Sequence, residues 1–242
     1  MIPYFVTPIS GNQDCALRAL KGAHGLVSFY APTQLEIVRQ FCQSFCIDNG
    51  AYSAWRSGKP ITDWQPYYDF VKSNLCPNLD FVIIPDIIEG TEKENDLLVS
   101  KFPFPNHISV PVWHMHESLD RLTTLSLNYP RIAIGGSCQY KLVGSLIWWE
   151  RINQAFERIC VDGIPICKVH GLRMLGPEIF TKLPLSSADS STLARNIGID
   201  KNWGGRFQPL TKETRATVLR ERIEFYQAAE RWEKVPIQDI LL

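Results

Sequence analysis

Three aspartates each close a short apolar or β-branched segment of this sequence. They are Asp48, Asp86 and Asp189. A carboxylate can act as a nucleophile, as a general acid or base, or as an acceptor that recognises the edge of a ligand. A single aspartate after a strand is just as often a helix cap or part of an Asx turn. Three at equivalent positions instead predict one shared site, provided that the segments are parallel strands whose ends meet.

Other polar and glycine residues follow the remaining segments in the same way. His114 and His116 follow one segment, Gly135-Gly136 another, and His170-Gly171 a third. Glycines form tight turns, and they also let backbone amides approach a flat ligand closely. The two histidines could bind a metal, but no third and fourth ligand can be assigned from the sequence. We therefore predict no metal site.

Apolar runs alternate with segments of helical period along the whole chain, and this alternation is typical of parallel βα proteins. The predicted strands are 4–7, 26–30, 45–48, 80–86, 108–113, 131–135, 166–169 and 185–189. The predicted helices are 33–43, 64–74, 91–102, 118–129, 145–161, 176–183 and 190–198, after a short first connection at 14–21.

Two of these helices have additional local support. Trp148, Ile152 and Phe156 belong to an apolar stripe that covers three turns of 145–161. Thr91 and Glu94 have the spacing of a capping box at the start of 91–102.

Eight units of about 30 residues each predict an α/β fold, a (β/α)8 TIM barrel. We expect one domain: a catalytic barrel over 1–200, followed by a C-terminal loop and helix over 201–242, with the helix near 211–235. An open doubly wound sheet is the alternative, but no glycine-rich phosphate motif follows the first strand. A barrel places its chemistry at the C-terminal ends of its strands, where the three aspartates lie.

The charge balance excludes a protein that coats nucleic acid with its whole surface. The chain has 25 basic and 25 acidic residues. Positive charge is concentrated in 191–222, which holds seven basic and three acidic residues. Any contact with a polyanion must be local, and we predict Arg206 and Lys212 as nucleic-acid contacts.

Neither a membrane span nor a leader is expected. The longest apolar runs fall far short of the roughly 20 residues that cross a bilayer, and the first ten residues, MIPYFVTPIS, lack the features of a secretory signal. We expect a cytoplasmic protein. Its seven cysteines contain no CxxC pair and are interpreted as buried free thiols.

Five segments together resemble a known family. They are Asp48-Asn49-Gly50-Ala51-Tyr52, Pro85-Asp86, Ile134-Gly135-Gly136, His170-Gly171-Leu172 running on through Gly176-Pro177-Glu178, and Ser187-Ala188-Asp189-Ser190-Ser191. In order and in placement they are similar to motifs of the tRNA-guanine transglycosylase superfamily over about residues 45–196. They look most like its short branch, the DNA 7-deazaguanine transglycosylases of phages and bacterial genomic islands.

The resemblance implies a role for each matching position. Asp189 would be the nucleophile and Asp48 would act in proton transfer. Tyr52 would stack on the base, Asp86 would read the guanine edge, and the backbone of Gly135 and Gly136 would receive its carbonyl. His114 and the pair His170-Gly171 would line the base pocket.

Two departures from the family bear on the substrate. The tRNA enzymes carry a C-terminal zinc site with a CxCxxC run, which this sequence lacks, and their Gly-Gly-Leu-x-x-Gly-Glu motif is Gly135-Gly136-Ser137-Cys138-Gln139-Tyr140-Lys141 here, without the glutamate. We therefore expect an enzyme that exchanges guanine in DNA for a free 7-deazaguanine base, without a cofactor. The alternatives are an RNA-acting relative, a metal-dependent barrel hydrolase that uses His114 and His116, and a non-catalytic partner subunit, against which Asp48 and Asp189 argue.

The reaction itself calls for the paired carboxylates. Replacing one base by another at the same sugar carbon retains the configuration, and two successive inversions through a covalent enzyme–sugar intermediate achieve this. One carboxylate must then attack C1′ while a second group protonates the departing base. Asp189 and Asp48 are our candidates for these two roles.

Overall fold

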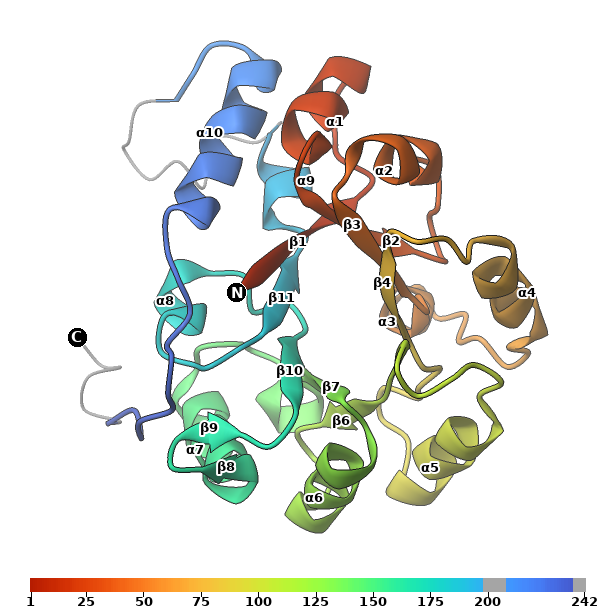
Figure 1. Ribbon diagram of the computed structural model, residues 1–242, viewed down its shortest axis with the longest axis vertical. Helices are drawn as coiled ribbons and strands as arrows, with labels where there is room; N and C mark the ends of the chain where they lie inside the picture. The colour runs from red at the N-terminus through yellow and green to blue at the C-terminus, as the bar shows by residue number, and fades with distance from the viewer. Residues whose placement is uncertain (198–207, 237–242) are drawn as a thin grey trace.

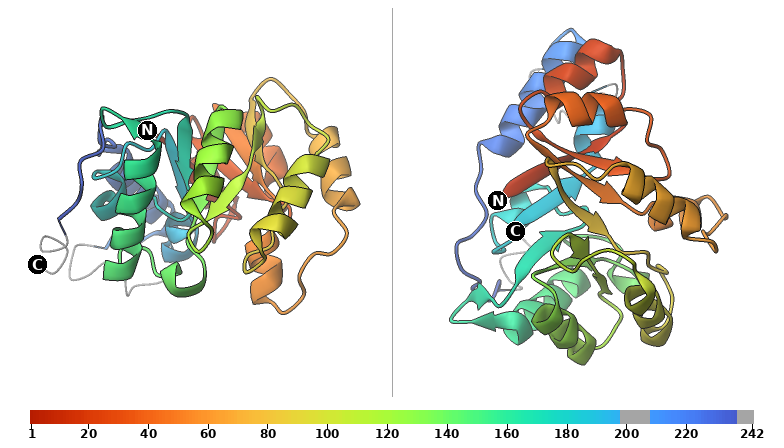
Figure 2. Two further views of the ribbon diagram at one scale, coloured as in Figure 1. Left: turned by 90° about the horizontal axis from the view of Figure 1, so that it is seen from below. Right: turned by 45° about the vertical axis from the view of Figure 1, so that its right-hand side comes forward.

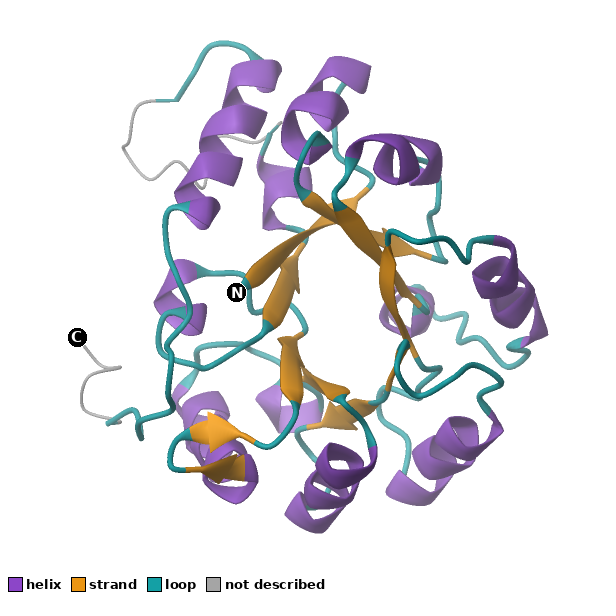
Figure 3. Ribbon diagram, viewed as in Figure 1, coloured by secondary structure: helices purple, strands orange, loops and turns teal. Residues whose placement is uncertain are grey.

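The computed structural model describes residues 1–197 and 208–236. It is an α/β structure in which helices surround a curved parallel sheet (Figures 1 and 3). The strands of this sheet are β1 (Ile2–Thr7), β2 (His24–Ser28), β3 (Ser44–Asp48), β4 (Leu79–Ile83), β5 (Ser109–Val110), β6 (Val112–His114), β7 (Arg131–Gly135), β10 (Lys168–Gly171) and β11 (Ser187–Ser190). A separate antiparallel pair consists of β8 (Cys160–Val161) and β9 (Ile164–Pro165).

The large sheet nearly closes on itself as a barrel. Its nine strands follow the order β5-β4-β3-β2-β1-β11-β10-β7-β6. The two strands at the ends of this order, β5 and β6, are separated in the chain only by Pro111. Proline has no N–H to donate to a ladder, whereas its carbonyl still accepts from the Ala133 N–H at 2.9 Å. The near closure disagrees with the open doubly wound alternative.

The helices of the described residues lie outside the sheet. They are α1 (Gln13–Leu20), α2 (Leu35–Phe41), α3 (Ala51–Arg56), α4 (Gln65–Ser73), α5 (Glu92–Lys101), α6 (Leu119–Asn128), α7 (Leu146–Ile159), α8 (Pro177–Phe180), α9 (Thr192–Asn196) and α10 (Lys212–Glu224), with a short 3-10 helix at Cys138–Tyr140. The capping box of α5 is present: Thr91 accepts from the Glu94 N–H, and the Glu94 carboxylate accepts from the Thr91 N–H.

Some expected boundaries are wrong, and a hairpin explains two of them. The sequence predicts a helix to residue 161 and a strand at 166–169, but α7 ends at Ile159 and β10 begins at Lys168. Asp162 and Gly163 between these elements have φ values of 52° and 77°. Two consecutive positive φ angles at Asp-Gly are typical of the tight turns that join antiparallel strands. Strands β8 and β9 therefore occupy the connection.

The last helix is shorter than predicted. It ends at Glu224, because its buried stripe stops at Ile223, and the next two side chains, Phe225 and Tyr226, are exposed. Helix α10 lies against α1, where Asn12 donates to Glu213 at 2.9 Å and Arg220 to the Lys21 carbonyl at 2.7 Å (Figure 2).

Beyond α10, the chain runs past α8 toward α7 (Figure 1). There the Asn153 amide forms reciprocal hydrogen bonds with the backbone of Val235, at 3.0 and 3.2 Å.

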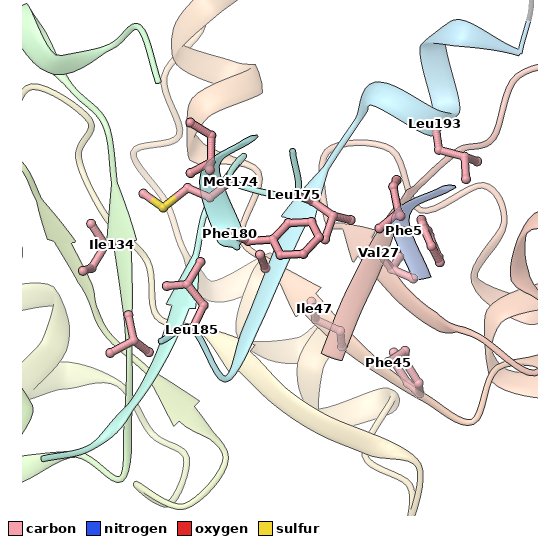
Figure 4. Packing of buried hydrophobic residues seen from close by; sticks show 14 of the residues in the cluster. Phe5, Val27, Phe45, Ile47, Ile134, Met174, Leu175, Phe180, Leu185 and Leu193 are labelled. Carbon is pink, nitrogen blue, oxygen red and sulfur yellow. The ribbon is translucent and has the colours of Figure 1, made fainter. Parts of the chain in front are cut away.

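Side chains alternate between two cores along most strands. Tyr4, Cys46 and Phe81 belong to the cluster inside the barrel, whereas their neighbours such as Phe5 and Phe45 pack between the strands and the helices (Figure 4). This alternation is the period of two expected for strands that are buried on both faces. All seven cysteines are free thiols; Cys15, Cys42 and Cys46 are buried, and the others are half-buried.

In the part of the chain that the structure describes, no helix combines the length and the apolarity needed to cross a membrane.

Candidate active site

The C-terminal ends of the barrel strands surround a cavity of about 430 Å³. Its wall contains all three predicted aspartates together with four other predicted residues, Tyr52, His114, Gly135 and Gly136. The aspartates come from three parts of the ring: Asp48 ends β3, Asp86 lies just beyond β4, and Asp189 lies in β11. The structure thus brings together carboxylates that are 38 to 141 positions apart in the sequence.

Asp48 is held by two donors and has a raised pKa. Its Oδ2 accepts from the Ser28 hydroxyl at 3.1 Å and from the Gly50 N–H at 3.0 Å. Burial, followed by the charges of Asp189 and Asp86, raises the pKa of Asp48 from 3.8 to about 7. A carboxyl group with this pKa can hold a proton at neutral pH and release it to a substrate.

Gly50 supplies the N–H that binds Asp48 and is the N-cap residue of α3. Its φ is +79°, in the left-handed region, and an added Cβ would lie 2.9 Å from the Tyr30 backbone nitrogen. The sequence did not predict α3, although this helix carries Tyr52 into the cavity wall.

Asp86 is fixed from both sides. Its Oδ1 accepts from the Asn49 amide at 2.6 Å, and its Oδ2 lies 2.8 Å from Nε2 of His114. Asn49 is held in turn, since it donates to the Ile84 carbonyl at 2.7 Å and accepts from the Ala51 N–H at 2.8 Å. Asn49 belongs to the segment from Asp48 to Tyr52, but the sequence predicts no role for it.

Asp189 is held through one oxygen only. Its Oδ1 accepts from the Arg173 N–H at 3.1 Å and lies 3.3 Å from Nε2 of His170. Among the described residues, no group donates a hydrogen bond to Oδ2. This second oxygen is therefore the one available for attack on a substrate.

His170 and Gly171 do not lie on the cavity wall, where the resemblance had placed them. His170 is fully buried behind Asp189, and its Nδ1 is 2.9 Å from the Ser187 hydroxyl. It thus packs behind the carboxylate and does not line the cavity. Gly171 serves packing, because a Cβ there would lie 2.8 Å from the Met174 sulfur and 2.9 Å from the Leu185 side chain.

Gly135, which ends β7, and Gly136, which follows it, present backbone to the cavity. The Gly135 carbonyl accepts from the Met115 N–H at 3.0 Å. Because a trans peptide is planar, the Gly136 N–H points away from Met115. A side chain at Gly136 is excluded, since its Cβ would lie 2.6 Å from the Tyr140 carbonyl oxygen.

Sequence reasoning missed Arg173, which touches three of the groups just described. Besides its N–H bond to Asp189, its guanidinium donates to the Gly136 carbonyl at 3.1 Å and lies over the Tyr52 ring, 4.4 Å from the centroid. Arg56 and Arg195 also belong to the cavity wall. The only signal in the sequence was a basic residue directly after His170-Gly171-Leu172.

The histidine pair does not form a metal site in the described part of the chain. His116 is 2.6 Å from the Ser137 hydroxyl and 3.1 Å from the Gly90 carbonyl, so it joins two loops. Within residues 1–197 and 208–236, no group of three histidine, cysteine or carboxylate side chains could hold a metal ion. These positions give no support to the metal-dependent hydrolase.

Of the two predicted nucleic-acid contacts, Lys212 does not line the cavity and Arg206 cannot be placed. Lys212 is exposed at the first position of α10, and Arg206 lies outside the described residues. Two other members of the basic segment donate hydrogen bonds to backbone carbonyls. Arg215 donates to the Pro209 carbonyl at 2.7 Å, and Arg220 donates to the Lys21 carbonyl at 2.7 Å. Among the described basic residues of this segment, Arg195 belongs to the cavity wall.

Comparison of the chain with family models, curated proteins and solved structures gave no match. Its function has to be inferred from the geometry and chemistry of the site.

Proposed function

We propose that the protein is a DNA-guanine transglycosylase that replaces guanine by a 7-deazaguanine base on a (β/α)8 barrel. If β5 and β6 are counted as one strand interrupted at Pro111, the ring has eight parallel strands, as this fold requires. The observation that carries the functional proposal is the set of three carboxylates in one cavity wall, each with different partners. Different environments allow chemically identical groups to take different roles.

In the first half of the reaction, Oδ2 of Asp189 attacks C1′ of the target nucleotide. The C1′–O bond forms as the bond from C1′ to guanine breaks, and the protonated Asp48 gives its proton to the departing base. In the second half, the incoming 7-deazaguanine loses a proton to Asp48 and its ring nitrogen attacks C1′, which releases Asp189. Atoms, electrons and the sugar configuration balance without a cofactor.

Asp86 and the Gly136 N–H select the base. Asn49 and His114 fix the orientation of Asp86, whose remaining lone pairs accept from the N1–H and the exocyclic amine of guanine. The Gly136 N–H donates to the guanine carbonyl. Adenine would leave these buried groups without partners, and that penalty favours guanine-type bases. A 7-deazaguanine has the same edge, so one pocket serves both halves.

The target nucleotide has to leave a DNA duplex or come from a single strand to reach the cavity. Tyr52 then offers an aromatic face for stacking. DNA is favoured over RNA by the absence of the family's zinc motif and of its Gly-Gly-Leu-x-x-Gly-Glu motif.

Base exchange with defined substrates tests this proposal. Purified protein is incubated with a labelled 7-deazaguanine base and either DNA or tRNA, and label in the polymer is measured. We expect label in DNA, together with a protein–DNA adduct that survives denaturation. Label in tRNA alone would favour the RNA-acting relative, and no label in either polymer would contradict the proposal.

A further inference from the structure

The geometry points to Arg173 as a side chain that occupies the position of the base in the empty site and is displaced when a base binds. This inference rests on the proposed function. Arg173 follows β10, its guanidinium binds the Gly136 carbonyl beyond the neighbouring strand β7, and it also covers Tyr52 on α3. Helix α3 follows β3, which is four places from β10 in the strand order.

The covered face of Tyr52 is the one that a base would need. Tyr52 and Arg173 line the same cavity, whereas Trp55, whose ring centroid is 5.9 Å from that of Tyr52, does not line it. The guanidinium is planar and lies 4.4 Å from the ring centroid, so it occupies the stacking position itself. A base that stacks there has to replace a cation–π contact by a base–aromatic contact.

The backbone of Arg173 keeps a separate task during this exchange. Its φ is +61°, a left-handed conformation that is uncommon for a residue with a side chain, and its N–H donates to Asp189. This bond does not involve the guanidinium. The side chain can therefore leave Tyr52 and Gly136 while the nucleophile stays in place.

Equilibrium binding of free 7-deazaguanine, measured by calorimetry, tests the inference in Arg173→Ala and Arg173→Lys. The alanine variant keeps the N–H and loses the competing guanidinium, so we expect its Kd to be about threefold to tenfold lower than that of the wild type. Lysine restores a cation but not a planar group that also reaches Gly136, and we expect an intermediate Kd. A side chain with only a structural role would not give tighter binding on truncation.

Lys182→Ala is the matched control. Lys182 lies over the Trp149 ring at 5.5 Å, and neither residue lines the cavity. This variant loses a cation–π contact elsewhere and should bind the base as the wild type does. Equal or weaker binding by Arg173→Ala, when the wild type binds, would overturn displacement and leave the proposed function standing. If neither protein bound a guanine-type base, the proposed function would fail and this inference with it.

Discussion

At the N-terminal end of the barrel, Asp80 accepts from Tyr4 at 2.5 Å and from Arg131 at 2.8 Å, whereas at the C-terminal end three aspartates share one cavity. Burial alone would raise the pKa of Asp80, but the hydrogen bonds from Tyr4 and Arg131 outweigh it and lower this pKa. The pKa of Asp48 is raised instead. Both ends thus combine aspartate, arginine and tyrosine, but the aspartate pKa is lowered at one end and raised at the other.

The difference lies in how negative charge is compensated. Asp80 has an arginine within hydrogen-bond distance, so its ionised form is stabilised and contributes to folding. At the other end, Arg173 binds Asp189 only through its backbone N–H, and Asp48 accepts only from neutral donors. Within the described residues, neither Asp48 nor Asp189 forms an ion pair with an arginine or a lysine, and carboxylates of this kind in a cavity are typical of active sites. Substitutions at the two ends should therefore separate stability from chemistry.

The largest effect is expected for Asp189→Ala. Removal of the attacking carboxylate should lower base exchange by about a thousandfold or more and abolish the denaturation-resistant adduct. The melting temperature should change little, because this side chain takes part in chemistry and does not belong to the core. Exchange above a few per cent of the wild-type rate would exclude Asp189 as the nucleophile.

Asp86→Asn should weaken the transition-state binding of guanine-type bases by about 2 to 4 kcal/mol. The substitution replaces an acceptor by a donor at the position proposed to bind the edge of the base. Binding of an oligonucleotide should stay near the wild-type level, because no phosphate contact is removed. The measurements are kcat/KM for the free base and the Kd for the oligonucleotide. Unchanged selectivity among purines would reduce Asp86 to a structural role.

The pH profile of guanine release should identify Asp48. A pKa raised to about 7 means that the proton is present below this pH and is lost above it, so the rate should fall about tenfold per unit above pH 7. In Asp48→Asn, the rate should be lower by about a hundredfold or more. Its pH profile should no longer bend near pH 7.

Stability gives an independent check of the same group. Because the pKa of Asp48 is higher in the folded chain than its ordinary value of 3.8, the free energy of unfolding should decline as the pH rises from about 4 through about 7. Asp48→Asn should remove this part of the decline. A pH dependence identical to that of the wild type would contradict the assignment.

The smallest effect on chemistry is expected for Asp80→Asn, which should preserve base exchange. It should lower the free energy of unfolding by about 1 to 3 kcal/mol, because it weakens the hydrogen bonds from Tyr4 and Arg131. The pKa of Asp80 is lowered, so its contribution is present above 3.8 and is lost as the pH falls through the folded value. Denaturant unfolding at pH 7 and at pH 3 should show a difference from the wild type that shrinks at the lower pH. A large loss of exchange in a folded variant would remove the contrast between the two ends.

Most strands could be predicted from the sequence, and so could the placement of the three aspartates at or just beyond strand ends. Apolar runs determine buried parallel strands, and Asp48 and Asp189 lie at or near the ends of theirs as predicted. The hairpin of β8 and β9 was missed because Ile159 and Ile166 continue the apolar pattern across the Asp162-Gly163 turn. A two-residue strand adds too little periodicity to be recognised.

The partners of the aspartates were beyond prediction. The contacts of Arg173 depend on its positive φ, and those of His170 depend on the register that places Ser187 beside it. Neither leaves a pattern in the sequence. Asn49 is similar, because its hydrogen bonds to the Ile84 carbonyl and to Asp86 require β3 and β4 to be already paired.

Pro111 makes the rigidity of the barrel uneven around its circumference. The segment that links β4 to β7 consists of strands of two and three residues, with a missing donor between them. Strand separation in the native protein should cost least on this arc, and transient breathing should begin there. Asp86 and His114 lie at the C-terminal ends of the strands in this arc. Asp189 lies across the barrel in β11, which is paired with β1 and β10 on its two sides. Thermal motion would thus loosen Asp86 and His114, the groups proposed to recognise the base, before it disturbs Asp189, the proposed nucleophile.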